Sequence, residues 1–387
     1  MRVLFDHQAF TMQTHGGVSR SFVELYHHFP QEVEATIGVL ESDNVYIQWL
    51  GGIKPSEYQY HHFLWDKDFC GKGYLHRWYD KLTGGGYYPD YNKNNSIKLL
   101  QEGNFDVFHP TYFDDYFLPY LNGKPFVLTI HDMIPELYPQ YFARDDFQIV
   151  KKRKLAPLAS AIITVSEHTK RDVVRLLDVP ESKVHIIYHG CSFPALWEAK
   201  PIYDLPYILY VGERRGYKNF IPFVKSIAVI LKSHPTIHVI CTGRPFVDEE
   251  LRLMDSLCIR ERFIHHWAKS DAVLFTLYHN ALCFIYASEY EGFGIPILEA
   301  YQAECPVMLN NASCFPEIAG DAAVYFTLDE RRNNLPEVME HFINMTTSEK
   351  MQLREKQNKR LKLYSWEKAA QELYQVYLSV ASHGCQI

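Results

Sequence analysis

Residues 288–300 read Ser288-Glu289-Tyr290-Glu291-Gly292-Phe293-Gly294-Ile295-Pro296-Ile297-Leu298-Glu299-Ala300, directly after the apolar run Leu282–Ala287. The apolar run predicts a buried strand, because it is short and ends at a glycine-rich segment. Pro296 stands where a helix would begin, since the first helical turn tolerates proline. The stretch therefore predicts a strand, a glycine-rich loop and a helix in succession.

Two carboxylates of this stretch, Glu291 and Glu299, are eight positions apart, so they can lie at opposite ends of one ligand. Carboxylates accept hydrogen bonds from the vicinal hydroxyls of a ribose or hexose. The backbone amides of Phe293, Gly294 and Ile295 would face an anion or sugar hydroxyls. The alternative is that Glu299 only interacts favourably with the positive end of its helix.

Short apolar runs alternate with helical patterns along the chain, which is typical of parallel α/β units. The first half predicts strands at Val3–Phe5, Asp106–His109, Phe126–His131, Ala161–Val165 and Val184–Tyr188. The second half predicts strands at Tyr207–Gly212, Ile237–Gly243, Phe263–His266, Leu282–Ala287, Pro306–Asn310 and Ala323–Phe326. The proline-rich stretch Pro194–Pro206 separates the two series and is interpreted as a linker.

This organisation predicts an α/β protein with two Rossmann-like domains that face each other across a cleft. We place the first domain at residues 1–198 and the second at residues 199–365. Ligands of open α/β sheets bind at the carboxyl ends of the strands, so the loops after strands form the candidate site. In the first predicted helix, Ser21 and Glu24 match a capping box.

Two more loops after strands have the chemistry of an anion site. Gly16-Gly17 precedes a helix, and glycines let backbone amides approach a ligand at a helix N-terminus. Residues 212–219 read Gly-Glu-Arg-Arg-Gly-Tyr-Lys-Asn, and their Arg214 and Lys218 can neutralise a diphosphate. The alternatives are an ordinary turn for the glycines and a solvated basic turn for the cations.

Composition excludes several classes of protein. The chain has 387 residues, of which 47% are hydrophobic and 22% charged, which excludes a disordered chain. Its net charge of −7 argues against a nucleic-acid binder, and no nucleic-acid partner is expected. The eight cysteines form no CxxC pair, and the first residues lack a signal-peptide pattern. We expect a reduced, cytoplasmic protein.

Two segments leave alternatives open. Residues 44–104 are rich in aromatic side chains and predict either an irregular insertion or a lid that stacks on an acceptor sugar. The run Lys151-Lys152-Arg153-Lys154 predicts either a solvated helix face or a peripheral contact with anionic lipid on the inner face of a membrane.

The chain resembles a GT-B glycosyltransferase of family 4, the retaining group whose donor site carries an E-x7-E motif, here Glu291 and Glu299. The resemblance to members that build bacterial surface polysaccharides runs through segments at residues 6–22, 128–135, 165–170, 188–190, 211–219, 315–323 and 364–370. The chain departs from it at Ala287, Arg215 and Glu304, where members usually have proline, glycine and glycine.

The resemblance implies a role for each motif residue. Glu299 would bind the ribose hydroxyls, and Glu291 would lie against the transferred sugar. Phe293, Gly294 and Ile295 would offer main-chain amides to the sugar or the phosphates.

The remaining residues would act from both sides of the cleft. Arg214 and Lys218 would clamp the diphosphate, while Gly16 and Gly17 would let the first domain approach it. His131 would face the donor sugar, as a contact or as a general base, and the alternative is a structural role. A final helix, about residues 366–382, would cross back to the first domain.

The implied activity is retaining, metal-independent transfer of a hexosyl unit from a GDP- or UDP-linked donor to a glycan or lipid-linked acceptor. GDP-mannose is one candidate donor. No cofactor and no metal ligands are expected, because cations would stabilise the leaving phosphate. The resemblance favours same-face attack over a double displacement with Glu291 as nucleophile. The alternatives are a sugar-nucleotide epimerase or hydrolase of the same architecture, or a non-catalytic nucleotide-sugar binding module.

Overall fold

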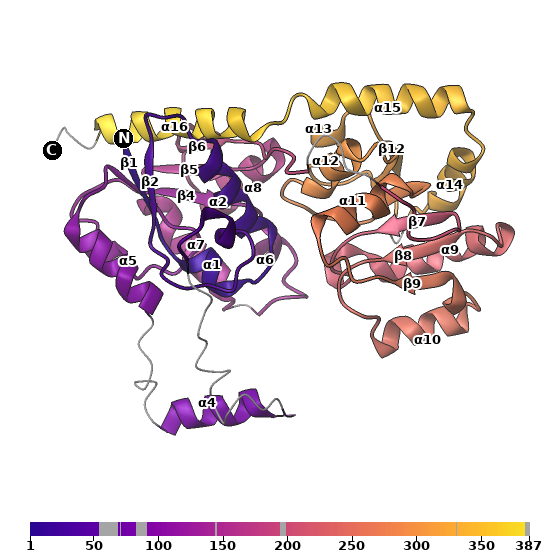
Figure 1. The fold of residues 1–387 in the computed structure, drawn as a ribbon, viewed down its shortest axis with the longest axis horizontal. Helices are drawn as coiled ribbons and strands as arrows, with labels where there is room; N and C mark the ends of the chain where they lie inside the picture. The colour runs from indigo at the N-terminus through magenta and orange to yellow at the C-terminus, as the bar shows by residue number, and fades with distance from the viewer. Residues whose placement is uncertain are drawn as a thin grey trace.

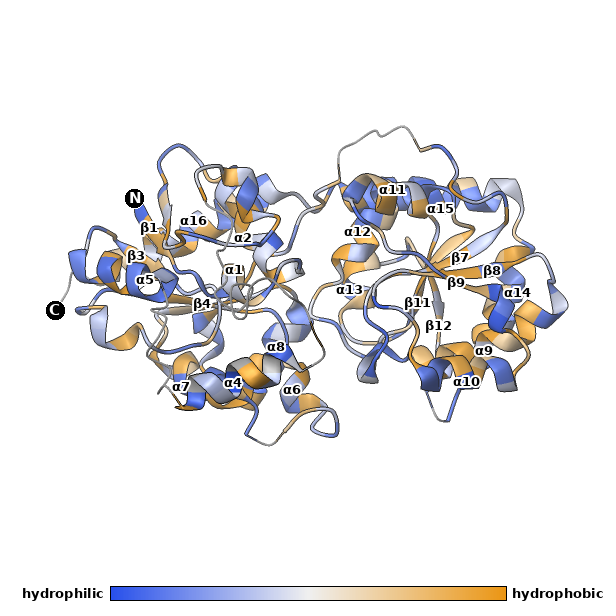
Figure 2. Ribbon diagram, turned by 60° about the horizontal axis from the view of Figure 1, so that its bottom comes forward, coloured by the Kyte–Doolittle hydropathy of each residue, from blue (hydrophilic) through white to orange (hydrophobic). Residues whose placement is uncertain are grey.

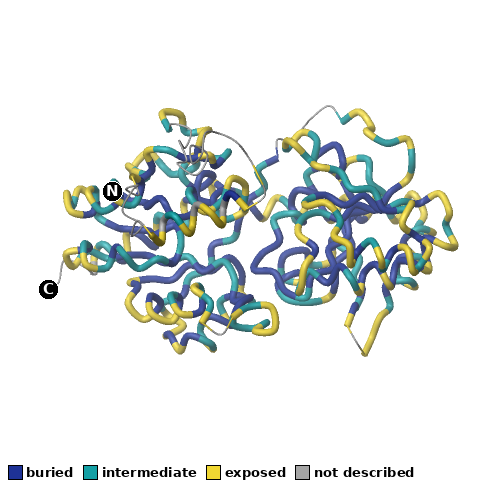
Figure 3. The backbone as a smooth tube through the Cα atoms, turned by 90° about the horizontal axis from the view of Figure 1, so that it is seen from below, coloured by how far each residue is buried: buried dark blue, intermediate teal, exposed yellow. Residues whose placement is uncertain are grey.

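The computed structural model describes residues 1–53, 69, 71–82, 91–143, 145–193, 199–329 and 331–383, which form two α/β lobes side by side (Figure 1). All strand pairs within the named sheets are parallel. In both lobes the buried residues lie mainly in the interior and the exposed residues lie on the outside (Figure 3). The expected α/β fold with two Rossmann-like units is confirmed.

The first lobe contains two three-stranded sheets. One has the order β2-β1-β3 and comprises β1 (Arg2–Phe5), β2 (Glu34–Ile37) and β3 (Val107–His109). The other has the order β4-β5-β6 and comprises β4 (Val127–Ile130), β5 (Ala161–Thr164) and β6 (Val184–Ile186). A parallel bridge from Phe108 to Phe126 joins the two sheets.

Helices and short 3-10 turns connect these strands. They are α1 (Gln8–Met12), α2 (Gly17–His28), η1 (Ile47–Leu50), α4 (Lys72–Leu82), α5 (Tyr91–Glu102), η2 (Leu118–Tyr120), α6 (Ile134–Leu137), α7 (Phe147–Leu158), α8 (Glu167–Leu177) and η3 (Glu181–Lys183).

The second lobe holds one six-stranded sheet of order β12-β11-β10-β7-β8-β9. Its strands are β7 (Tyr207–Tyr210), β8 (His238–Cys241), β9 (Phe263–His265), β10 (Cys283–Tyr286), β11 (Val307–Asn310) and β12 (Val324–Phe326). Its helices are η4 (Gly216–Lys218), α9 (Phe220–Ser233), α10 (Asp248–Ser256), η5 (Arg260–Arg262), α11 (Asp271–His279), α12 (Ile295–Gln302), α13 (Phe315–Ala319), α14 (Leu335–Ile343) and α15 (Thr347–Leu361).

The central strands of this second sheet are apolar on both faces because helices cover both (Figure 2). One apolar core lies on the face with α11, α12 and α13, and the other lies under α9, α10 and α14. Strands that are buried on both faces of a parallel sheet have continuous apolar sequences, and β10 has such a sequence. The loop after the carboxyl end of β10 contacts the first lobe.

The last helix, α16 (Trp366–His383), returns to the first lobe as expected and packs there beside α2 (Figure 1). Trp366, Leu373 and Tyr377 join the core that contains Phe5 and Phe22. The return is tight at Gly190, where a Cβ atom would lie 2.5 Å from the backbone nitrogen of Trp366. Only a glycine fits that crossing without a shift of the helix.

Several sequence-based predictions can be checked against these elements. Every predicted strand is present within a few residues, but β2 was missed because its residues are alternately exposed and half-buried in a short run. The capping box was wrong: α2 begins at Gly17, so Ser21 and Glu24 lie inside the helix. Part of the expected linker and the boundary at residue 198 fall outside the described residues, as do residues 54–68, 70 and 83–90 of the aromatic segment.

Candidate donor site between the lobes

The centre of the site is an ion pair between Lys218, at the end of η4, and Glu291, in the loop after β10. The Lys218 Nζ lies 2.6 Å from Glu291 Oε1, and Ser288 Oγ donates to the same oxygen at 2.7 Å. Burial works to lower the pKa of Lys218, but the Glu291 carboxylate, Tyr217 and Asp132 together outweigh it, and the pKa is raised. Lys218 is therefore a fixed cation at the carboxyl edge of the sheet.

Two residues of the next loop hold the backbone of Glu291. Ser313 Oγ accepts a hydrogen bond from the Glu291 amide at 3.1 Å and donates to the Glu291 carbonyl at 2.7 Å. Cys314 Sγ also contacts that carbonyl, at 3.1 Å. The sequence motif did not reveal this support, because residues 313 and 314 are far from residue 291 in the chain.

The loop presses directly against the first lobe at Gly292. A Cβ atom there would lie 1.8 Å from the carbonyl oxygen of His131, so no larger residue fits without a shift. Thr169 Oγ1 donates to the Gly292 carbonyl at 3.3 Å, and Tyr290 Oη donates to Asp172 at 2.7 Å. The structure thus brings the backbone of His131 against the loop that carries Glu291, from the opposite lobe.

His131 lies at the end of β4 with its Nε2 buried and without a hydrogen-bond partner. Burial lowers its pKa to about 4, so the ring is neutral at neutral pH. Such a group is a poor general base but can form a hydrogen bond with a neutral sugar hydroxyl. His131 also lines a cavity of about 220 Å³, together with Gln13, Tyr112, Asp132 and Tyr217.

Asp132, which the sequence analysis did not single out, belongs to this site. Burial works to lower the pKa of Lys218, and the Asp132 charge, with Glu291 and Tyr217, works to raise it. In the sequence, only the position of Asp132 directly after His131 pointed to this residue.

At the other end of the site, Glu299 lies in α12 and is buried. Tyr278 Oη donates to Glu299 Oε2 at 3.3 Å, and Arg20 Nη1 lies 3.5 Å from Glu299 Oε1. Burial raises the pKa of Glu299 to about 7, although Arg20 works in the opposite direction. The two motif carboxylates therefore lie in different environments. Glu291 pairs with Lys218 of its own lobe, whereas Glu299 lies beside Arg20 of the opposite lobe.

The glycine pair at the start of α2 reaches the loop of the second lobe. A Cβ atom on Gly17 would be 4.0 Å from Ile295 Cδ1, and Gly16 caps the helix. Gly294 has φ +95°, a left-handed conformation at the start of α12 that favours glycine. The Phe293 side chain is buried in the apolar core, which leaves its backbone for any ligand contact.

Arg214 is not brought into this group, contrary to the expected diphosphate contact. Its Nε donates to Glu250 at 3.0 Å, and its Nη atoms donate to the carbonyls of Thr242, Arg244 and Pro245. The guanidinium also stacks near Phe246. Arg214 therefore braces the loop after β8, because four of its five donors are already used.

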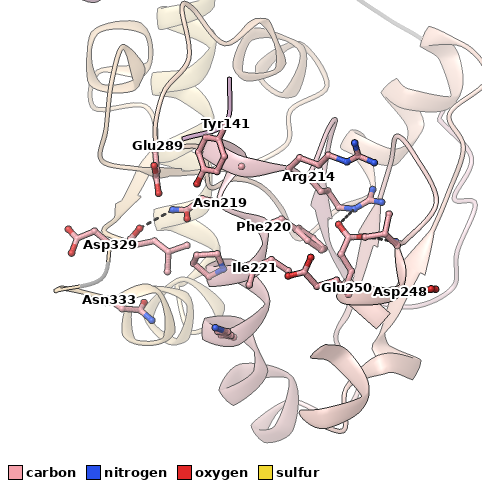
Figure 4. A pocket seen from close by; sticks show the side chains of 17 residues that line it. Tyr141, Arg214, Asn219, Phe220, Ile221, Asp248, Glu250, Glu289, Asp329 and Asn333 are labelled. Carbon is pink, nitrogen blue, oxygen red and sulfur yellow. Dashed lines mark hydrogen bonds and ion pairs between the residues drawn. The ribbon is translucent and has the colours of Figure 1, made fainter. Parts of the chain in front are cut away.

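Beside this brace lies a cavity of about 1040 Å³ (Figure 4). Arg215 lines it and is exposed, and Tyr141 of the first lobe lies over Gly216. Glu289, Asp248 and Asp329 also line it.

The basic run of α7 does not present four unpaired cations. Lys151 and Lys154 both pair with Asp115, and the wholly buried Lys152 pairs with Glu136 at 2.9 Å. These pairs favour the structural interpretation of the run over a lipid contact. None of the described helices has the length and apolar character needed to cross a membrane.

The two facing Rossmann-like lobes, with a final helix that crosses back, define the GT-B class of glycosyltransferases. Comparison with family models agrees: residues 15–192 match "Glycosyltransferase Family 4" and residues 197–362 match "Glycosyl transferases group 1". Together the two matches span nearly all of the chain. The chain belongs to the family 4 glycosyltransferases.

Curated relatives include enzymes of surface-polysaccharide synthesis. The chain is 30% identical over 227 residues to O-antigen chain mannosyltransferase B of Escherichia coli, a match that covers 54% of this chain and 59% of that protein. It is 24% identical over 257 residues to O-antigen chain mannosyltransferase RfbU of Salmonella typhimurium, which covers 64% and 70%. The match to the first relative thus spans under two thirds of its length.

Solved structures share the fold. The Anabaena protein Alr3699/HepE in complex with UDP and glucose has a TM-score of 0.68 at 15% identity, with 98% of this chain and 100% of that chain covered. A glycosyltransferase from Rickettsia africae has a TM-score of 0.66 at 15% identity, with 98% of both chains covered.

Proposed function

We propose that this protein transfers a hexosyl unit, with mannose as the candidate, from a nucleoside-diphosphate sugar to a hydroxyl of a glycan or lipid-linked oligosaccharide. The observation that carries the proposal is the Lys218–Glu291 pair, packed through Gly292 against His131 of the opposite lobe. A carboxylate and its paired cation thus lie at the loop that meets the backbone of His131, whose imidazole is neutral, where the two lobes contact each other. Glu299 lies at the far end, where a ribose would be.

Mannose is the candidate sugar because two relatives are named as O-antigen mannosyltransferases. The same names support a surface polysaccharide as the product. The base of the donor is proposed as guanine, because GDP-mannose is the candidate donor, or as uracil, because a fold relative was solved with UDP. A cytoplasmic site of action is part of this proposal.

The residues support a mechanism with retention of configuration. When the bond at the anomeric carbon breaks, negative charge grows on the leaving phosphate, and Lys218 with the α12 amides would stabilise it. Glu291 Oε1 already accepts from Lys218 and Ser288, which makes it a weak nucleophile and favours attack from the same face. The leaving phosphate would then take the proton of the acceptor hydroxyl, without a metal ion or a cofactor.

A panel of GDP- and UDP-linked sugars tests this function. The proposal predicts that one donor stabilises the protein against heat, because a ligand at 100 times its dissociation constant adds about 2.7 kcal/mol. With an oligosaccharide acceptor, NMR of the product should show the donor's anomeric configuration. An altered free sugar nucleotide would indicate an epimerase, release of free sugar a hydrolase, and binding without turnover a non-catalytic module.

A further inference from the structure

Arg20, in α2 of the first lobe, reaches across the cleft into the second lobe. Its Nη2 donates to Asp271 Oδ2 at 2.7 Å, and its Nη1 lies 3.5 Å from Glu299 Oε1. Its side chain is only 6% exposed. One guanidinium therefore links the start of α11 and the second motif carboxylate to the opposite lobe.

The surroundings hold this long side chain in place. The guanidinium carbon lies 5.4 Å from the centre of the Tyr46 ring and 5.9 Å from that of Phe193. Arg20 Nε is buried without a hydrogen-bond partner, and Glu24 lies 3.9 Å from it, beyond hydrogen-bond distance. A buried donor left unpaired is costly, so a functional reason for the placement is expected.

We propose that Arg20 is a positioning residue of the nucleotide site, which holds the ribose-binding carboxylate of Glu299 in its acceptor form and ties lobe closure to Asp271. This proposal rests on the proposed function, which assigns the ribose to Glu299. The short bond goes to Asp271, whereas the contact with Glu299 is 3.5 Å long. Glu299 therefore keeps lone pairs for two ribose hydroxyls while the cation stays beside it.

The electrostatics of Glu299 give the proposal a distinctive readout. The groups that face Glu299 are Arg20 from α2, Asp271 and Tyr278 from α11, Tyr46 directly before η1 and Cys191 from the segment before the second lobe. Burial raises the pKa of Glu299 to about 7, and Arg20 is the group that opposes this rise most. Loss of Arg20 should raise the pKa further, so the carboxylate would be protonated at a higher pH.

Isothermal titration of the full chain with UDP and GDP, from pH 6 to pH 9, tests the assignment. Arg20→Gln should weaken binding of the preferred nucleotide about ten- to a hundredfold at pH 7, the range for a lost bond to a charged group. Nucleotide affinity should fall at low pH as Glu299 becomes protonated, and in Arg20→Gln this fall should begin at a higher pH than in wild type. Arg20→Lys should keep that loss near the wild-type pH, and Arg260→Gln, which breaks the exposed Arg260–Asp255 pair, should bind like wild type.

Equal or tighter binding by Arg20→Gln, or an unmoved pH dependence, would overturn the proposal. If Arg20→Gln does not fold, Asp271→Asn decides from the other lobe: weaker binding supports the link, and unchanged binding overturns it. Failure of the proposed function looks different. In that case wild type binds neither nucleotide, or Glu299→Gln binds as well as wild type.

Discussion

Glu291 is the residue on which transfer should depend most. Glu291→Gln keeps an oxygen for Lys218 and Ser288, so the loop should fold normally. Loss of the carboxylate charge beside the transferred sugar should lower turnover about 100- to 1,000-fold, the scale of one lost electrostatic group in an active site. Steady-state kinetics with the identified donor measure this.

The matched control is Glu289→Gln, two residues earlier in the same loop. Glu289 and Arg215 line the large cavity, whereas Lys218 and Glu291 do not. The turnover of this control variant should stay near that of wild type. Near-normal turnover of Glu291→Gln, with the control also normal, would contradict the site.

Glu299 should make the stability of the protein depend on pH. Its pKa is raised in the folded state to about 7, so folding favours its protonated form. The wild-type protein therefore loses stability as the pH rises from the pKa of Glu299 in the unfolded chain through its pKa of about 7 in the folded protein. The Glu299→Gln variant does not, because glutamine does not ionise. We expect the variant to gain up to about 3 kcal/mol over wild type at pH 8 and almost nothing at pH 4.5, measured by urea unfolding.

A constant difference between the two proteins at both pH values would show that the pKa of Glu299 is not raised in the folded state.

The sequence could place Glu291, Glu299 and Lys218 after strands of one sheet, because the apolar runs before them predict those strands. It could not show that Arg214 is used up by Glu250 and three carbonyls, since those partners lie 28 to 36 residues away.

At the level of elements, the loop after β10 is the part that fits most tightly. Gly292→Ala would place a Cβ atom 1.8 Å from the His131 carbonyl, so the lobes must move apart there. We expect turnover to fall at least about tenfold while the melting temperature changes little, because the clash is between lobes and not within a core. Kinetics and thermal unfolding of the same preparation separate the two effects.

Gly190→Ala provides the contrast. Its Cβ atom would lie 2.5 Å from the Trp366 backbone nitrogen, where α16 returns to the first core. This variant should lose stability first. If Gly292→Ala were the less stable of the two, or fully active, the inferred contact between lobes would be wrong.

The strands and the order of elements followed from the sequence, because continuous apolar runs mark strands buried on both faces. Contacts between lobes did not follow from it. Glu317, at the start of α13, accepts hydrogen bonds from the amides of Glu167 and His168 and so caps α8 in the other lobe. A local capping pattern shows only the Ser166 cap of α8, which accepts from Thr169.

For the whole molecule, the two halves of the site lie on different lobes, so ligand binding should favour closure. Asp172, Thr169 and Arg20 of the first lobe already bond to the second lobe. Small-angle scattering should show a smaller radius of gyration with the donor than without it. The effect should be reduced in Asp271→Asn, and no compaction in wild type would contradict closure.

The most direct test of the central claim is a crystal structure of the full chain with its nucleoside-diphosphate sugar. The account predicts the diphosphate between Lys218 and the Gly16-Gly17 turn, the ribose on Glu299, and the sugar between Glu291 and His131. A nucleotide bound elsewhere, or one that contacts neither carboxylate, would contradict it.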